Sequence, residues 1–143
     1  MGQESVVYGV IKDAIFGAND EARRHRQINK SVLAGLPSIE DWPLLSREMF
    51  RWPADTVNLN DMRTDVMHFG TSYKGVEYEW EQWLATFEQM LAQMYWVSAT
   101  VHLETEFNGV HTFTWQAEGD FHEPGGAEGL AVRCEWSRES SVF

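Results

Sequence analysis

Seven apolar residues recur at helical spacing between positions 76 and 94 of this chain. Successive members are four, three, one, three, four and three residues apart, which is the apolar face of a helix with a period of about 3.6 residues. They are Val76, Trp80, Trp83, Leu84, Phe87, Leu91 and Met94. The stripe predicts a helix over Val76–Met94 that forms the central element of the core, with Trp80 and Trp83 as core side chains.

Two segments of alternating polarity follow and predict a hairpin, with strands over Tyr95–Glu106 and Val110–Glu118. A two-residue turn at Asn108 and Gly109 would divide the apolar residues between the two faces. A three-residue loop over 107–109, with Gly109 left-handed at a bulge, keeps them on one face. This register pairs Leu103 with Phe113 and Val101 with Trp115. The opposite, solvent-facing side then carries His102, Glu104, Glu106, Thr112, Thr114 and Gln116.

The remaining segments predict further strands and a second helix. The expected strands are Val6–Ile11, Arg47–Trp52, Asp65–Tyr73 and Leu130–Trp136. The expected helix is Glu21–Ala34, whose inward stripe is Ala22, Ile28, Val32 and Leu33. We therefore expect a single α+β domain over residues 1–143, with a loose tail over 137–143. Its mostly antiparallel sheet would have about five strands, with two main helices packed on one face.

The charge of the chain is strongly one-sided. The net charge is −11, and the stretch from Gly75 to Val132 contains ten acidic residues without one Lys or Arg. Such a surface repels phosphate, so nucleic acid and anionic membranes are disfavoured as partners and a partner with a basic surface is favoured. The N-terminus lacks a signal peptide, and no apolar run reaches the roughly 20 residues that span a bilayer. We expect a cytoplasmic protein.

The predicted contact surface combines carboxylates from this stretch with two tryptophans. Glu77, Glu81 and Glu88 lie off the apolar stripe, and no Lys or Arg stands four residues away to pair with them. Trp42 and Trp52 stand next to prolines in an irregular segment, which suits exposed anchors of an interface. The predicted contact set is Glu77, Glu81, Glu88, Glu104, Glu106, Asp120, Glu123, Trp42 and Trp52.

No pattern in the sequence identifies a catalytic or cofactor site. Four histidines accompany the many carboxylates, but none forms a metal-ligand spacing such as HExxH. They are His68, His102, His111 and His122. The single cysteine, Cys134, alternates within an expected strand and suits a small buried residue better than a nucleophile. We therefore predict no metal, no cofactor and no catalytic residue.

Three consecutive segments, within Val6–Trp115, have the order and character of a known class of proteins. They are LPSIEDWPLLSREMFRWP, VMHFGTSYKGVEYEWEQWLATFEQML and YWVSATVHLETEFNGVHTFTW. This layout resembles the small acidic immunity proteins that Gram-negative bacteria encode beside polymorphic toxins delivered by contact-dependent or type VI secretion. The resemblance implies a bacterial protein that neutralises a cognate toxin in a tight one-to-one complex, without catalysis.

Two other hypotheses stay open at the level of the sequence. A small-molecule binding domain or enzyme would place carboxylates in a cleft between the sheet and the proline-rich segment, with inward-facing Glu and His in a deep pocket. A homodimer would set the acidic face of one copy against the basic Arg23–Lys30 helix of the other.

Overall fold

The computed structural model describes residues 4–14, 20–41, 43–51, 64–106, 109–125 and 133–137. Within them the strands are β1 (Glu4–Ala14), β2 (Phe50–Arg51), β3 (Thr64–Lys74), β4 (Ser98–Thr105), β5 (Gly109–Gln116) and β6 (Arg133–Ser137). The α-helices are α1 (Asp20–Ala34) and α2 (Trp80–Ala92). The short 3-10 helices are η1 (Ile39–Asp41), η2 (Arg47–Met49) and η4 (Val76–Glu79).

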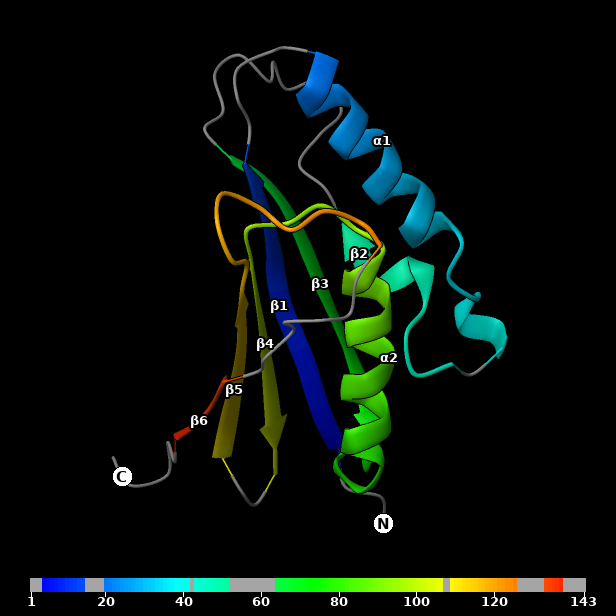
Figure 1. Ribbon diagram of the computed structural model, residues 1–143. Coiled ribbons are helices and arrows are strands. Elements are labelled where there is room, and N and C mark those ends of the chain that lie inside the picture. Colours follow the sequence, from blue (N-terminus) through cyan, green and yellow to red (C-terminus); the bar gives the residue numbers. More distant parts are fainter. Residues whose placement is uncertain are drawn as a thin grey trace.

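The described strands form one antiparallel sheet in the order β2-β3-β1-β4-β5-β6. Both α-helices pack on the same face of this sheet, and no described helix lies on the other face (Figure 1). The predicted α+β class, with a mostly antiparallel sheet and two helices on one face, is confirmed.

β1 lies at the centre of the sheet, between β3 and β4. Its alternate residues Val7 and Ile11 are fully buried in the core that the helices cover. Gly9 stands between them on the same face, where an added Cβ would lie 2.0 Å from the carbonyl oxygen of Thr100 on β4. The close approach of the two backbones therefore requires glycine at this position.

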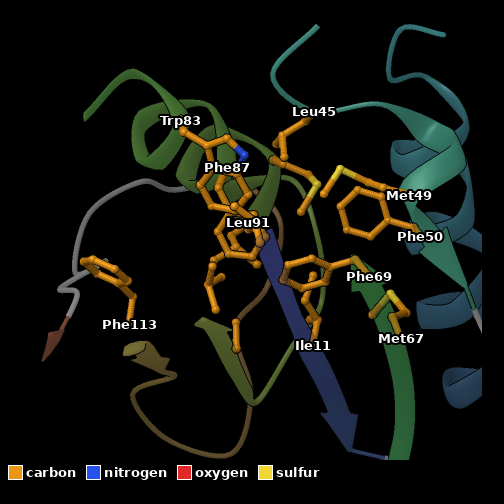
Figure 2. Close-up of a cluster of buried hydrophobic side chains, with 14 of the residues drawn as sticks. Ile11, Leu45, Met49, Phe50, Met67, Phe69, Trp83, Phe87, Leu91 and Phe113 are labelled. Carbon is orange, nitrogen blue, oxygen red and sulfur yellow. The ribbon is translucent and has the colours of Figure 1, made fainter. Parts of the chain in front are cut away.

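The apolar stripe of the long helix forms the centre of the core, as predicted. Trp83, Phe87 and Leu91 have 0% exposed surface and lie over the sheet (Figure 2). Trp80 and Leu84 are half-buried and pack against the edge of this core. The 3.6-residue spacing thus identified both the helix and the side that it buries.

The ends of that helix differ from the prediction. Gly75 is left-handed, with φ of 69°, and Val76–Glu79 then forms a 3-10 helix rather than the first α-helical turn. α2 starts at Trp80 and stops at Ala92, two residues before the predicted end at Met94. The spacing of apolar residues does not distinguish a 3-10 turn from an α-helical turn at the start of the helix, because Val76 is on the buried side in either case.

The register of the β4–β5 hairpin differs from the prediction by two residues. The observed pairs include Thr105 with Gly109, Val101 with Phe113 and Ala99 with Trp115. Gly109 is left-handed as predicted, with φ of 78°. A shift of two leaves each side chain on its predicted face, so alternation alone cannot separate the registers. The observed register places Trp115 beside the small Ala99. The Trp115 ring packs on the Phe87 ring, with 5.1 Å between their centroids.

α1 faces the sheet with a different side from the predicted one. Its buried residues are Ala22, His25, Asn29 and Leu33, so His25 and Asn29 take the inward places expected for Ile28 and Val32. His25 Nδ1 lies 3.0 Å from Oδ2 of Asp13 on β1. Asn29 exchanges two hydrogen bonds, of 2.9 and 2.8 Å, with the backbone of Tyr95. These partners satisfy the Asn29 amide and Nδ1 of His25, whereas the buried Nε2 of His25 has no hydrogen-bond partner among the described residues and lies 3.8 Å from Oε1 of Glu21.

The proline-rich segment contains less strand than predicted. The predicted strand Arg47–Trp52 is wrong in its first half, which forms η2, and β2 comprises only Phe50 and Arg51. Leu45 and Met49 nevertheless reach the core beside Phe50 (Figure 2). The predictions for Trp42, Trp52, residues 130–132 and the tail beyond residue 137 lie outside the described residues.

Candidate acidic interface

Several chain elements meet at one end of the molecule. β1 starts there, β3 ends there, η4 leads into α2 there, and the β4–β5 hairpin turns there (Figure 1). The pairing register agrees, because Glu4 pairs with Lys74 and Ser5 pairs with Thr105. Segments that are some 70 and 100 residues apart in the sequence are therefore neighbours at this end.

Among the described residues, six carboxylates gather at this place, which we call the acidic end. They are Glu4, Glu77, Glu79, Glu81, Glu104 and Glu106. All except Glu77 are exposed, and Lys74 contributes a positive charge beside them. Four of the six, Glu77, Glu81, Glu104 and Glu106, belong to the predicted contact set, and the fold places all four at the same end of the molecule. Glu104 is on the sheet face opposite to α2, because its neighbours Leu103 and Thr105 are buried on the core face.

A buried serine fixes the start of the helical segment against the sheet. The hydroxyl of Ser5 accepts a hydrogen bond from the backbone N–H of Val76 at 3.2 Å and donates one to Oε1 of Glu77 at 3.2 Å. Ser5 is 0% exposed, so these bonds are shielded from water. The carboxylates of η4 and of the first turn of α2 are thereby held on a rigid base rather than on a loose loop.

Tyr78 is an exposed aromatic residue at the acidic end. It is 79% exposed and stands between Glu77 and Glu79 in η4. Large aromatic side chains flanked by charges are typical anchors of protein interfaces. The predicted contact set does not include Tyr78. Its position off the apolar stripe and between two glutamates indicates an exposed aromatic residue. The predicted anchors Trp42 and Trp52 lie outside the described residues.

The other three predicted carboxylates lie elsewhere. Glu88 sits in the middle of α2 and accepts a hydrogen bond from Nε1 of Trp115 at 3.1 Å. Asp120 and Glu123 are exposed in the segment that follows β5, whose Gly125 N–H bonds the carbonyl of Ala92 at 2.9 Å. Ala92 ends α2, about 18 Å along the helix from its start. The predicted set therefore forms one cluster and two separate positions rather than a single surface.

A groove of about 810 Å³ lies beside the acidic end, between the end of β3 and the proline-rich segment. Its lining residues are Glu4, Ile39, Pro43, Leu44, Ser46, Thr71, Ser72, Tyr73, Lys74 and Glu79. This is the location where the small-molecule hypothesis placed its cleft. Glu4 and Glu79 are exposed rather than inward-facing, and the lining contains no histidine. The titratable side chains along this lining are Glu4, Tyr73, Lys74 and Glu79, and the Tyr73 hydroxyl is engaged by Leu44 and Trp83.

Tyr73 holds the wall of the groove in place. Its hydroxyl donates a hydrogen bond to the carbonyl of Leu44 and accepts one from Nε1 of Trp83 at 3.1 Å. Burial raises the pKa of the Tyr73 phenol above its ordinary value, because the charged form would lose its hydration. The proline-rich segment is thus tied to both β3 and α2 through one side chain.

The histidines are occupied in separate contacts. His102 Nδ1 lies 2.9 Å from Oγ1 of Thr112, and its ring packs on that of Tyr8. His122 Nδ1 lies 3.0 Å from the carbonyl oxygen of Met94. Across the described ranges, no group of three His, Cys, Asp or Glu side chains converges to hold a metal ion. The described chemistry at the acidic end is therefore that of carboxylates and an exposed phenol.

In the part of the chain that the structure describes, no helix combines the length and the apolar character needed to cross a bilayer. Comparisons with protein-family models, with curated proteins and with solved structures find no match to this chain. The geometry and charge of the acidic end, with Tyr78 and the adjacent groove, are thus the features from which a function can be derived.

Proposed function

We propose that this protein is an immunity protein that binds a cognate bacterial toxin through its acidic end and so neutralises it. One observation carries the proposal: separate elements bring six carboxylates and the exposed Tyr78 to the same end of the sheet. The charges sit on β-strands, a hairpin and a helix start. Such pre-ordered charge raises the rate of encounter with a basic partner and fixes its orientation.

The chemistry of the site favours recognition over catalysis. The carboxylates of the acidic end are mostly exposed, which leaves them accessible to the surface of a partner protein. A toxin that acts on nucleic acid or a nucleotide needs a basic site to hold phosphate. An inhibitor that presents carboxylates to that site competes with the substrate's own charge.

The charge distribution on the rest of the surface is consistent with this orientation. The exposed Arg23 and Arg24 lie in the first part of α1, near the end of the molecule opposite to the acidic end (Figure 1). A basic partner is therefore attracted more strongly to the acidic end than to the start of α1, where Asp20 and Glu21 offset the two arginines. This asymmetry favours a single docking orientation, which suits a one-to-one complex.

The test is a growth assay in bacteria. The toxic C-terminal domain expected from the gene immediately upstream is expressed with and without this protein. We expect growth to be restored by the wild-type protein, and a one-to-one complex to be recovered by size-exclusion chromatography. An upstream gene for a metabolic enzyme, or a toxic domain that still kills in the presence of this protein, would overturn the proposal.

A further inference from the structure

Within the residues that the structure describes, one edge of β3 is open beside the groove. β1 pairs with β3 along its whole length, from Thr64 to Lys74. On the other side β2 pairs only with His68 and Phe69, because η2 turns the chain away from the sheet before Phe50. In the described ranges, no strand pairs with Thr71–Lys74 on that side. Every second residue of this stretch therefore directs its backbone N–H and C=O into the groove region.

The groove next to this edge has a fixed apolar wall. Ile39 is 52% exposed, and Pro43 and Leu44 are half-buried in the same wall. The hydrogen bond from the Tyr73 hydroxyl to the Leu44 carbonyl sets the distance between this wall and β3. The wall supplies apolar surface to side chains of any strand placed against the edge.

We propose that Thr71–Lys74 and the adjacent groove accept an extended segment of the basic partner as an added β-strand. In this mode of recognition, main-chain hydrogen bonds to the open edge supply affinity and the pockets for alternate side chains supply specificity. Apolar side chains of the segment contact Ile39, Pro43 and Leu44. The basic character of the segment rests on the proposed function.

Charge selects a basic segment over other occupants. Glu4 and Glu79 line the groove, and the remaining carboxylates of the acidic end lie at the same end of the sheet. A second copy of this chain would bring the same carboxylates against them, which is unfavourable in a two-fold contact. Lys74 sits at the open edge, where lysine commonly discourages unintended strand pairing. The positive charge of Lys74 repels a basic segment at this position. Removal of that charge is therefore expected to strengthen binding of the segment.

The test uses short labelled peptides and fluorescence anisotropy with the full chain. The probe is an octapeptide of alternating Lys and Val. One control is the same Lys-Val peptide with every backbone nitrogen methylated, which keeps the charge but lacks the N–H donors, and another alternates Glu and Val. We expect the Lys-Val peptide to bind at least about tenfold more tightly than either control, equivalent to about 1.4 kcal/mol. Equal binding of both lysine peptides, or no binding of Lys-Val, would overturn strand addition.

Two readouts locate the peptide. Hydrogen exchange of amides within Thr71–Lys74 is expected to slow when the Lys-Val peptide is bound, because the open edge becomes paired. The variant with Glu4→Gln and Glu79→Gln is expected to bind it several-fold more weakly, and Lys74→Gln more tightly. The matched control, with Glu118→Gln and Glu123→Gln, removes the same charge from exposed positions away from the groove and is expected to bind normally. Unaltered exchange in Thr71–Lys74 on binding contradicts the proposal.

The outcome is separable from that of the proposed function. If the toxin is neutralised in the growth assay while the Lys-Val peptide fails to bind the edge, strand addition is wrong and immunity stands. If the peptide binds at the edge but no toxin is neutralised, the edge is a recognition site and immunity is wrong.

Discussion

Oδ2 of Asp13 on β1 and Nδ1 of His25 on α1 lie 3.0 Å apart, and their side chains are only 3% and 1% exposed. The pair connects the first helix to the central strand, with the His25 ring stacked on Tyr95 at 3.7 Å. α1 buries few large apolar side chains, so this contact has a large share in holding it on the sheet. His25 is therefore a structural residue, with Glu21 the nearest further acid at 3.8 Å.

Replacement of His25 should destabilise the protein strongly. His25→Ala removes a hydrogen-bond partner of the buried Asp13 side chain, and leaving a buried polar group without such a partner costs about 1–3 kcal/mol. The measurement is the urea midpoint by circular dichroism. Arg23→Ala on the exposed side of the same helix is the control, with an expected change below about 0.5 kcal/mol. Equal midpoints for the two variants would show that the pair contributes nothing to stability.

Gly9 should be intolerant of even one added methyl group. In Gly9→Ala the new Cβ would meet the Thr100 carbonyl oxygen at 2.0 Å, so the two central strands must move apart. Overpacking of this kind costs roughly 1–3 kcal/mol. Gly70→Ala on β3 is the matched control, because its Cβ would meet its nearest neighbour at an ordinary 3.5 Å. Thermal unfolding of the two variants checks the prediction, and a stable Gly9→Ala protein would contradict it.

The sequence predicted those features that depend on local periodicity. The stripe through Trp83 and Phe87 specifies a helix and its buried side, because seven apolar residues repeat at one period. The hairpin faces were also correct, but the register was wrong by two residues, since Val101 lies on the core face in either register. Choosing between registers requires knowing that Trp115 packs on Phe87.

Features that depend on distant partners were not predictable in the same way. His25 and Asn29 look like surface residues until Asp13 and the Tyr95 backbone are placed beside them. The sequence predicted an excess of acidic charge. Which carboxylates meet at the acidic end depends on the strand order, which brings Glu4 there from the far end of the sequence. A pattern of charges along the chain contains no information about that order.

Tyr73→Phe should loosen the wall of the groove. It should also make the free energy of unfolding less dependent on pH in the alkaline range. The change removes the hydrogen bonds to Leu44 and Trp83, with an expected loss of about 1–2 kcal/mol near neutral pH. Because burial raises the pKa of Tyr73 in the folded state, its contribution is complete below the unfolded value of about 10. That contribution is lost as pH rises from there toward the folded pKa.

Urea titrations at several pH values between neutral and alkaline measure this effect. The wild-type protein should lose stability above pH of about 10 more steeply than Tyr73→Phe. Tyr78→Phe is the control for removal of a phenol at the surface, because its side chain is 79% exposed. Parallel profiles for wild type and Tyr73→Phe would contradict a raised pKa in the folded state.

Charge reversal should show whether the toxin docks at the acidic end or at the carboxylates elsewhere on the surface. Glu104→Lys with Glu106→Lys is expected to slow association with the toxin by about tenfold at low salt, because both exposed charges steer the basic partner. Asp120→Lys with Glu123→Lys changes the net charge equally at positions near the other end of α2 and should slow it much less. Stopped-flow association rates over a range of salt concentrations measure both. Both pairs change the net charge, and hence long-range steering, by the same amount, but only Glu104 and Glu106 lie on the hairpin. Equal slowing by the two pairs would therefore show that the hairpin is not part of the interface.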